Sequence, residues 1–260
     1  MPPDYSRELE FALELARLGG EVALQHYQHS PERKRKGDGT WVTEADVGAE
    51  AAIRKRVAEV FPDHNVLGEE EGLARATGAQ PVDGAPTWVV DPIDGTNNFM
   101  DGIPVWATLV ALQHEGATVV GVAHAPALEE TYDAASALGA RMNGSAISID
   151  PIDSLEQATV LHGGDHGFVD TDLEQLHHNL ARRAFRARGF GDFWGHMLVS
   201  RGAAHVMVEP VLSVWDVAAL IPIVTEAGGR LTHIDGSPWT DRGSALTTNG
   251  ILHDTVVSLR

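Results

Sequence analysis

The chain has 260 residues, of which 43% are hydrophobic and 22% charged, and it contains no cysteine. The lack of cysteine excludes disulfides, thiolate nucleophiles, iron–sulfur clusters and zinc fingers. With 37 acidic and 19 basic residues the formal net charge is −18, which disfavours binding to nucleic acid. An enzyme acting on small anions would need a local cation, such as a metal, to overcome this field.

Targeting and membrane segments are not apparent in the sequence. The first residues lack the basic start and apolar stretch of a signal peptide. No segment approaches the roughly 18 apolar residues that a membrane helix needs. We therefore expect a cytoplasmic protein without membrane contact.

Helical spacing of apolar residues predicts a helix over 6–28 and a second helix that begins after Thr43 and ends at Pro62. Asp46 completes a capping box with Thr43. Between the helices, the basic run within 33–39 indicates either a solvated loop or a cationic flap over an anion site.

Strand patterns follow from residue 87 onward. Residues 72–86 are predicted to form a long loop, 87–90 a buried strand, and 105–113 with 117–124 a hairpin. The second half alternates between strands and helices: strands near 158–162, 205–208, 229–233 and 245–249, and helices near 170–182, 194–203 and 214–227. This mixture predicts a layered α/β architecture of two halves, 1–150 and 151–260.

The most informative stretch, 88–99, reads Trp-Val-Val-Asp-Pro-Ile-Asp-Gly-Thr-Asn-Asn-Phe. Its strand delivers Asp91 and then Asp94 to the carboxyl end, where α/β proteins gather ligands. Two such close carboxylates require a proton or a cation between them, and oxygen-only ligands favour Mg²⁺. Gly95 and Thr96 offer backbone N–H groups and a hydroxyl to an anion. A plain turn is the alternative explanation of the same residues.

Further carboxylates flank this stretch. Three adjacent acids, 69–71, follow residues 66–67, which look like the end of a buried strand; a solvated charge run is the alternative. Asp216 lies in the first turn of a helix that Ser213 caps, a position where capping alone favours an acid. Its place beside Trp215 predicts partial burial, and a buried carboxylate needs a partner.

Other metal and phosphate motifs are excluded. In the haloacid dehalogenase signature, Asp-x-Asp-Gly-Thr, an acid stands two residues before the second Asp, but here Pro92 stands two before Asp94. The ligand spacing of an EF-hand is also absent. The 13 histidines show no His-Glu-x-x-His pattern, and we expect most of them on the surface or in loops. His177 and His178 are neighbours on a helix and cannot both face one metal.

Four motifs, at 42–46, 68–70, 91–99 and 215–219, together resemble the inositol monophosphatase family. The resemblance covers nearly the whole chain as a single domain over 1–260. It implies a layered αβαβα sandwich and a Mg²⁺-dependent, lithium-sensitive phosphomonoesterase, commonly a homodimer. Two shorter stretches, 188–196 and 203–210, resemble the histidinol-phosphate phosphatase branch of that family.

Carried onto this sequence, the resemblance implies five metal ligands: the carboxylates of Glu69, Asp91, Asp94 and Asp216 and the backbone carbonyl of Ile93. It places the phosphate on Gly95 and Thr96, with Asp46 polarising Thr96 to orient the attacking water and Glu69 also serving catalysis. Two or three Mg²⁺ ions per site would lower the pKa of a bound water and clamp both oxygens of an in-line displacement. Glu70 is expected to support the ligands from outside.

The substrate preference is inferred from charge. Glu209 sits where the family contacts the organic part of its substrate, and Asp94 and Asp216 are also expected at the substrate. Histidinol phosphate carries an ammonium and an imidazole, which would suit Glu209 and Asp192 by charge and Trp194 by its ring face. Asp192 equally suits a helix cap, and Trp194 suits core or dimer-interface packing. Arg188 either binds phosphate or pairs with the surplus acids.

Three functions follow from these observations. The leading hypothesis is a histidinol-phosphatase, a hydrolase serving histidine biosynthesis. The enzymatic alternative is an inositol-phosphate phosphatase that also accepts fructose bisphosphate or nucleotide phosphates. The non-enzymatic alternative is a catalytically idle metal-binding interaction protein.

Overall fold

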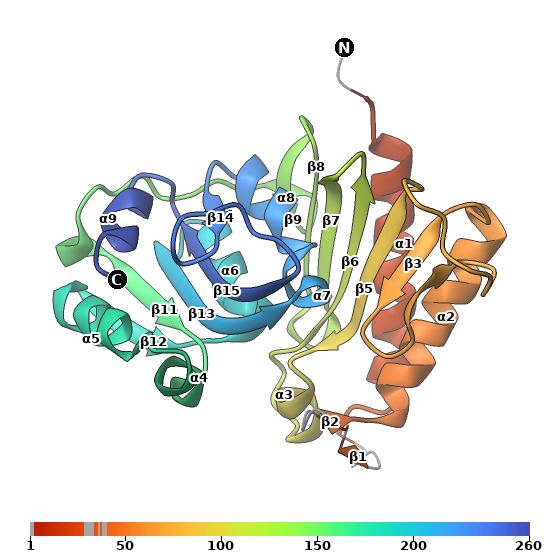
Figure 1. Ribbon diagram of the computed structural model, residues 1–260, viewed down its shortest axis with the longest axis horizontal. Coiled ribbons are helices and arrows are strands. Elements are labelled where there is room, and N and C mark those ends of the chain that lie inside the picture. The colour runs from red at the N-terminus through yellow and green to blue at the C-terminus, as the bar shows by residue number, and fades with distance from the viewer. Residues whose placement is uncertain (1–2, 29–33, 36, 38–40) are drawn as a thin grey trace.

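The computed structural model describes residues 3–28, 34–35, 37 and 41–260 (Figure 1). Helix α1 (Ser6–Leu24) ends four residues before the predicted end, and Tyr27 is buried in the turn that follows. Helix α2 (Glu44–Val60) begins at the predicted capping box. The short strands β1 (Lys34–Arg35) and β2 (Trp41–Val42) pair antiparallel. Residues 33, 36, 38 and 39 of the predicted flap lie outside the described residues.

The larger sheet has eight strands in the order β10-β9-β8-β7-β6-β5-β3-β4. Only β3 and β5 in it run parallel. Its strands are β3 (Asn65–Gly68), β4 (Gly72–Arg75), β5 (Thr87–Asp94), β6 (Ala107–His114), β7 (Ala117–Ala125), β8 (Glu130–Ala135), β9 (Gly139–Met142) and β10 (Ser145–Ala146).

The predicted loop over 72–86 is partly wrong, because β4 pairs with β3 along its whole length. That strand reads Gly-Leu-Ala-Arg, which is too short and too weakly alternating to signal a strand by itself. Strands β8 to β10 were not predicted either. The hairpin predicted between β6 and β7 is confirmed.

The smaller sheet has five strands in the order β12-β11-β13-β15-β14. Strand β11 is parallel to both of its neighbours, whereas β15 runs antiparallel to β13 and β14. The strands are β11 (Thr159–His162), β12 (Arg186–Gly189), β13 (Val206–Ser213), β14 (Arg230–Thr232) and β15 (Arg242–Thr248). The edge strand β12 was not predicted.

Helices form three layers around the two sheets, as Figure 1 shows. Helices α1 and α2 cover the outer face of the larger sheet, and apolar side chains of α6 to α8 pack on its inner face. Helices α4, α5 and α9 contribute to a separate cluster on the smaller sheet. These helices are α4 (Asp165–Asp170), α5 (Glu174–Arg183), α6 (Asp192–Ser200), α7 (Val214–Val217), α8 (Leu220–Glu226) and α9 (His253–Val257), with 3₁₀ turns η1 (Pro126–Leu128) and η2 (Leu155–Gln157).

Strand β5 illustrates how the sequence specifies the layers. Trp88 and Val90 pack against α1 and α2, whereas Val89 packs toward α6 and α8. Because side chains alternate across a strand, Asp91 emerges on the same side as Val89, the side of α7. The predicted αβαβα sandwich is confirmed.

One predicted helix begins late and another is interrupted. The helix predicted near 170–182 is α5, which begins at Glu174 because Asp172 lies in the left-handed region at φ 58°; the preceding α4 was not predicted. The helix over 214–227 is α7 and α8. Pro222 lies in the first turn of α8, where its missing N–H is tolerated. Among the described residues, no helix is long and apolar enough to cross a membrane.

Candidate metal and phosphate site

Three carboxylates converge between the two sheets. Asp91 and Asp94 lie at the end of β5, and Asp216 lies on α7. One carboxylate oxygen from each lies within 4.8 Å of the others. Asp91 and Asp94 are only 2% and 6% exposed. The structure therefore brings together three of the predicted ligands from segments 120 residues apart.

The electrostatics of this cluster favour a bound cation. Burial, followed by the charge of Glu69, raises the pKa of Asp91 well above its usual range, and burial and Asp192 do the same for Asp94. Burial raises the pKa of Asp216 to about 6. The surrounding cavity, about 380 Å³, has no basic residue among its described lining. Carboxylates without a basic partner need protons or a metal.

The turn after β5 is built to present backbone groups. Gly95 adopts φ 83°, and α3 (Thr96–Met100) starts directly after it. The Ile93 N–H donates to Asp91 Oδ1 at 3.0 Å, and the Thr96 hydroxyl donates to the Ile93 carbonyl at 3.0 Å. The Phe193 N–H donates to Asp94 Oδ2 at 2.8 Å. These bonds fix the predicted carbonyl and carboxylate ligands before any ion binds.

Asp46 is buried beside the cluster. Its Oδ2 accepts the backbone N–H and the hydroxyl of Thr43, at 2.7 and 2.6 Å. Its Oδ1 is buried without a hydrogen-bond partner. Burial raises the Asp46 pKa to about 6, and the charge of Glu69 adds to this rise. The hydroxyl of Thr96 points to Ile93 and not to Asp46, so an unpaired carboxylate oxygen is left to receive a polar ligand such as water.

Glu69 follows the end of β3, and a buried carboxylate holds the turn behind it. Glu50 on α2 is fully buried and accepts the N–H groups of Glu70 and Glu71, at 2.8 and 3.1 Å. Arg54 donates to the same carboxylate at 2.8 Å. Sequence reasoning missed this support; the signal was the Glu–Arg pair four residues apart on a predicted helix. Glu70 thus contributes its backbone to the turn.

A second compartment, about 590 Å³ in volume, lies beside the acidic one, and Asp192 lines both. Glu209 and Trp194, both expected at the substrate, are among its lining residues. Burial raises the pKa of Glu209 to about 8, with a contribution from Asp192, whose N–H donates to Glu209 at 3.0 Å. Arg188 lines neither compartment; it is exposed and donates to the carbonyl of Ala187.

The structure also bears on the alternative roles predicted for Asp192 and Trp194. Asp192 starts α6 and accepts from Asn98 at 2.8 Å, so it is both a helix-terminal residue and a wall of the compartment. The Trp194 indole N–H donates to Glu130 at 3.2 Å, and the ring lies 5.2 Å from that of Phe190.

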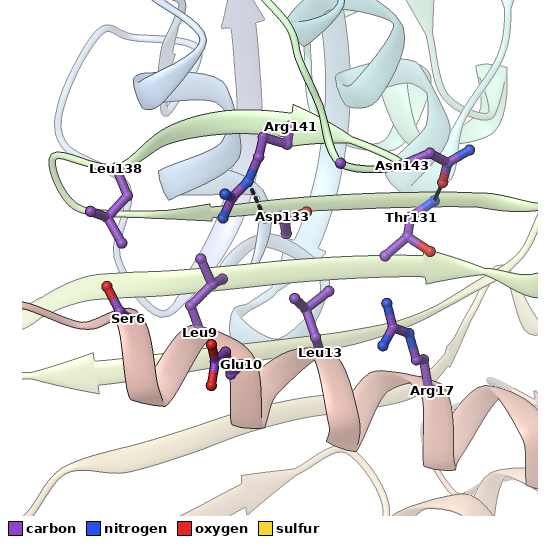
Figure 2. A pocket seen from close by; sticks show the side chains of 11 residues that line it. Ser6, Leu9, Glu10, Leu13, Arg17, Thr131, Asp133, Leu138, Arg141 and Asn143 are labelled. Atoms are coloured by element: carbon purple, nitrogen blue, oxygen red, sulfur yellow. Dashed lines mark hydrogen bonds and ion pairs between the residues drawn. The ribbon is translucent and has the colours of Figure 1, made fainter.

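A larger cavity lies elsewhere. It measures about 680 Å³ and is lined by α1 and by residues of β8 and β9 (Figure 2). Its Asp133 is paired with Arg141 at 2.9 Å. No group of three metal-ligating side chains lines it within the described chain. Size therefore does not select the functional site, and the chemistry points to the smaller acidic cavity.

A model of the inositol monophosphatase family matches residues 4–260. This chain belongs to that family. The family is metal-dependent, and the converging carboxylates and the unpaired Asp46 oxygen fit such an ion. The chain is accordingly a phosphatase.

Individual relatives indicate which members of the family this chain resembles. The chain is 41% identical over 229 residues to a histidinol-phosphatase of Mycobacterium tuberculosis, covering 86% of this chain and 85% of the relative. It is 38% identical to a histidinol-phosphatase of Chlorobaculum parvum, covering 96% and 95%. A Thermotoga maritima IMPase structure superposes with a TM-score of 0.86 at 30% identity, covering 97% and 96%.

Proposed function

We propose that the protein hydrolyses L-histidinol phosphate to L-histidinol and phosphate with Mg²⁺ as cofactor. The observation that carries this proposal is the convergence of Asp91, Asp94 and Asp216 beside a second, acid-lined compartment. The identity to two histidinol-phosphatases, 41% and 38%, supports the substrate. The oxygen-only ligand set supports Mg²⁺ over softer metals.

The acidic compartment would hold the ions and the phosphate. The groups that would hold Mg²⁺ are the carboxylates of Glu69, Asp91, Asp94 and Asp216 and the carbonyl of Ile93. When bound, Mg²⁺ neutralises phosphate charge and makes a bound water acidic enough to attack at neutral pH. The backbone of Gly95 and the start of α3 face the same cavity, which suits phosphate oxygens.

The residues around the ions have their own tasks. The unpaired Oδ1 of Asp46 can accept a hydrogen bond from the attacking water and orient it. Its raised pKa, about 6, lets it receive a proton near neutral pH. Thr96 fixes the Ile93 carbonyl through its hydroxyl.

The second compartment would bind the alcohol part of the substrate. Glu209 is buried and Asp192 half-buried, and the described lining of this compartment holds no lysine or arginine to pair with them. A substrate ammonium placed there would lower their pKa and hold them ionised. The ring of Trp194 offers an apolar or cation–π surface to the imidazole. A polyol would meet these acids without supplying a positive charge.

The experiment measures phosphate release from histidinol phosphate, inositol 1-phosphate and fructose 1,6-bisphosphate, each with Mg²⁺ and with EDTA. We expect an EDTA-sensitive preference for histidinol phosphate and no release by Asp94→Asn. Glu209→Gln should lower kcat/KM for histidinol phosphate by roughly 30-fold or more, because it removes one partner of a buried charge pair. Its kcat/KM for inositol 1-phosphate should change little.

The alternative is a phosphatase for inositol phosphate and fructose bisphosphate. It is favoured by 32% identity to a Thermotoga maritima fructose-1,6-bisphosphatase/inositol-1-monophosphatase, covering 96% of this chain and 94% of that protein. Equal rates on the three substrates, or inositol phosphate ahead, would establish it. No release under any condition would instead favour an idle metal-binding protein.

A further inference from the structure

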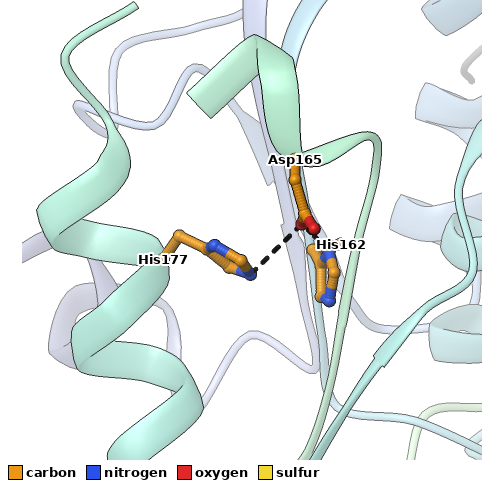
Figure 3. A group of neighbouring side chains, drawn as sticks. All are labelled: His162, Asp165 and His177. Carbon is orange, nitrogen blue, oxygen red and sulfur yellow. Dashed lines mark ion pairs between the residues drawn. The ribbon is translucent and has the colours of Figure 1, made fainter. Parts of the chain in front are cut away.

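A second group of metal-ligating side chains lies at the end of the smaller sheet (Figure 3). His162 ends β11, Asp165 begins α4, and His177 lies on α5. One ligand atom from each lies within 4.8 Å of the others. Nδ1 of His162 is 3.5 Å from Oδ1 of Asp165, and Nε2 of His177 is 4.0 Å from the same oxygen.

The two imidazoles are held in place by their surroundings. The His177 ring stacks on Phe168 with centroids 4.6 Å apart and an 18° tilt, and lies 4.4 Å from the His162 ring. The side chains of His162 and His177 are 16% and 25% exposed, whereas that of Asp165 is 77% exposed. The rigid members are therefore the imidazoles, and the carboxylate is free to adjust.

The distances suit a small tetrahedral ion. With Zn–N and Zn–O bonds of about 2.0–2.2 Å, neighbouring ligand atoms lie about 3.3–3.5 Å apart. The contact between His162 and Asp165 already matches this value, and a side-chain rotation of the exposed Asp165 would shorten the 4.0 Å contact to His177. No backbone movement is required for that step.

The donor set selects the metal. Imidazole suits zinc and its neighbours in the transition series, whereas Mg²⁺ prefers oxygen. The His177 nitrogen that faces Asp165 is Nε2, 4.0 Å from Oδ1, and an imidazole nitrogen there can donate a lone pair to such a metal. Without a metal, Nδ1 of His162 lies 2.9 Å from the Gly163 carbonyl; binding a metal through that atom requires the tautomer with the proton on Nε2 and gives up this contact.

We propose that His162, Asp165 and His177 form a Zn²⁺ site, separate from the acidic cluster, that fastens α4 and α5 to the end of β11. His162 and Asp165 also line the second compartment, together with Glu209. The fourth coordination position is taken by water. The ion would therefore stabilise a wall of the compartment that, on the proposed function, receives the alcohol part of the substrate.

The site is tested by metal binding, without reference to turnover. Zn²⁺ titration by calorimetry and Co²⁺ titration by visible absorption are made on the full chain carrying Asp94→Asn, with Mg²⁺ in excess. This background weakens Zn²⁺ binding at the acidic cluster, and the comparison of His177→Ala with His178→Ala assigns the binding that is left. We expect one Zn²⁺ per chain that Mg²⁺ does not displace, and the strong Co²⁺ absorption of a four-coordinate site containing imidazole.

His177→Ala and Asp165→Asn should each weaken Zn²⁺ binding by roughly 100-fold or more, since even outer-sphere partners contribute 10–100-fold. His178→Ala is the matched control, because His178 is the next residue on α5, is exposed and lies outside the cluster. It should bind as the parent does. Circular dichroism confirms that each variant is folded.

The proposal is overturned if the parent binds no Zn²⁺, or if His177→Ala and His178→Ala bind equally well. The phosphatase assay on the wild-type chain is independent of this result. An inactive protein that binds Zn²⁺ at this site would reject the proposed function alone, and an active protein that does not bind it would reject the zinc site alone.

Discussion

The turn that carries Glu69 depends on a glycine that cannot acquire a side chain. A Cβ on Gly68 would overlap the carboxylate of Glu50, which is fully buried. That carboxylate holds two backbone N–H groups of the turn and the Nε of Arg54, at distances of 2.8–3.1 Å. In Gly68→Ala, either the carboxylate or the strand end must move, and Glu69 moves with it.

The expected loss can be estimated from these contacts. Overpacking a buried position costs about 1–3 kcal/mol, and each hydrogen bond to a charged group contributes about 1.5–3 kcal/mol. Partial loss of both gives a destabilisation of about 2–4 kcal/mol, or about 5–15 °C in Tm for a chain of this size. A 1 Å shift of a group at the site can lower kcat on the order of 100-fold.

The assay combines thermal unfolding with phosphate release in Mg²⁺. Gly48→Ala is the matched control, because Gly48 lies on α2 and an added Cβ would only touch Val22 at 3.5 Å. It should stabilise the helix by up to about 1 kcal/mol and leave kcat unchanged. Wild-type kcat and Tm in Gly68→Ala would refute the argument that Glu50 fixes this turn.

Three further predictions concern the site and its electrostatics. Gly95→Ala should lower both stability and kcat, because it strains φ 83° and brings a Cβ to 3.0 Å from the Val105 carbonyl. Gly102→Ala is the control: with φ 73° and open space around it, it should lower stability alone. Equal kcat values in the two variants would contradict this. Asp94→Asn should raise Tm in EDTA by about 2–4 °C per kcal/mol of relieved repulsion. It should also abolish the rise in Tm that Mg²⁺ causes in the wild type. If Mg²⁺ stabilises the variant as much as the wild type, Asp94 holds no ion. His196 is buried with its pKa lowered to about 3, so the unfolded chain binds the extra proton and the free energy of unfolding falls as pH drops from about 6.5 toward 3. His196→Asn should remove about 1.4 kcal/mol per pH unit of that slope between pH 6 and 5, measured by urea unfolding; parallel curves for the two proteins would disprove it.

The fold was largely predictable because the side chains of β5 alternate between its two faces, and this alternation shows which helix layer each residue contacts. Trp88 and Val90 face one helix layer and Val89 the other, as strand geometry requires. Elements that depend on tertiary partners were missed. Strand β4 exists because β3 offers an unpaired edge, and β12 because β11 does; neither has a pattern strong enough to identify it alone.

The residues of the site likewise fall into those that the sequence identified and those that it did not. Asp91 and Asp94 were identifiable because the turn that presents them is local, and Asp216 because its place beside Trp215 predicts partial burial and the motif at 215–219 matches the family. The role of Glu50 was not identifiable, since its carboxylate meets Glu70 and Glu71 only after α2 packs on the sheet. His162 and His177 are 15 residues apart on different elements, and no local spacing links them. Arg188 shows the converse case, a motif residue that lies outside both compartments.

The acidic cluster joins the two halves of the chain across their contact. Its ligands come from β5 on one side and α7 on the other, and nearby Gly121 of β7 lies so close to the Ala219 carbonyl that a Cβ would not fit. An ion that needs both halves to bind must favour their association by the same free energy. On the proposed function, metal supply would therefore affect the cohesion of the molecule as well as its turnover. In metal-poor conditions, the contact between the halves is where amide exchange and proteolysis should begin.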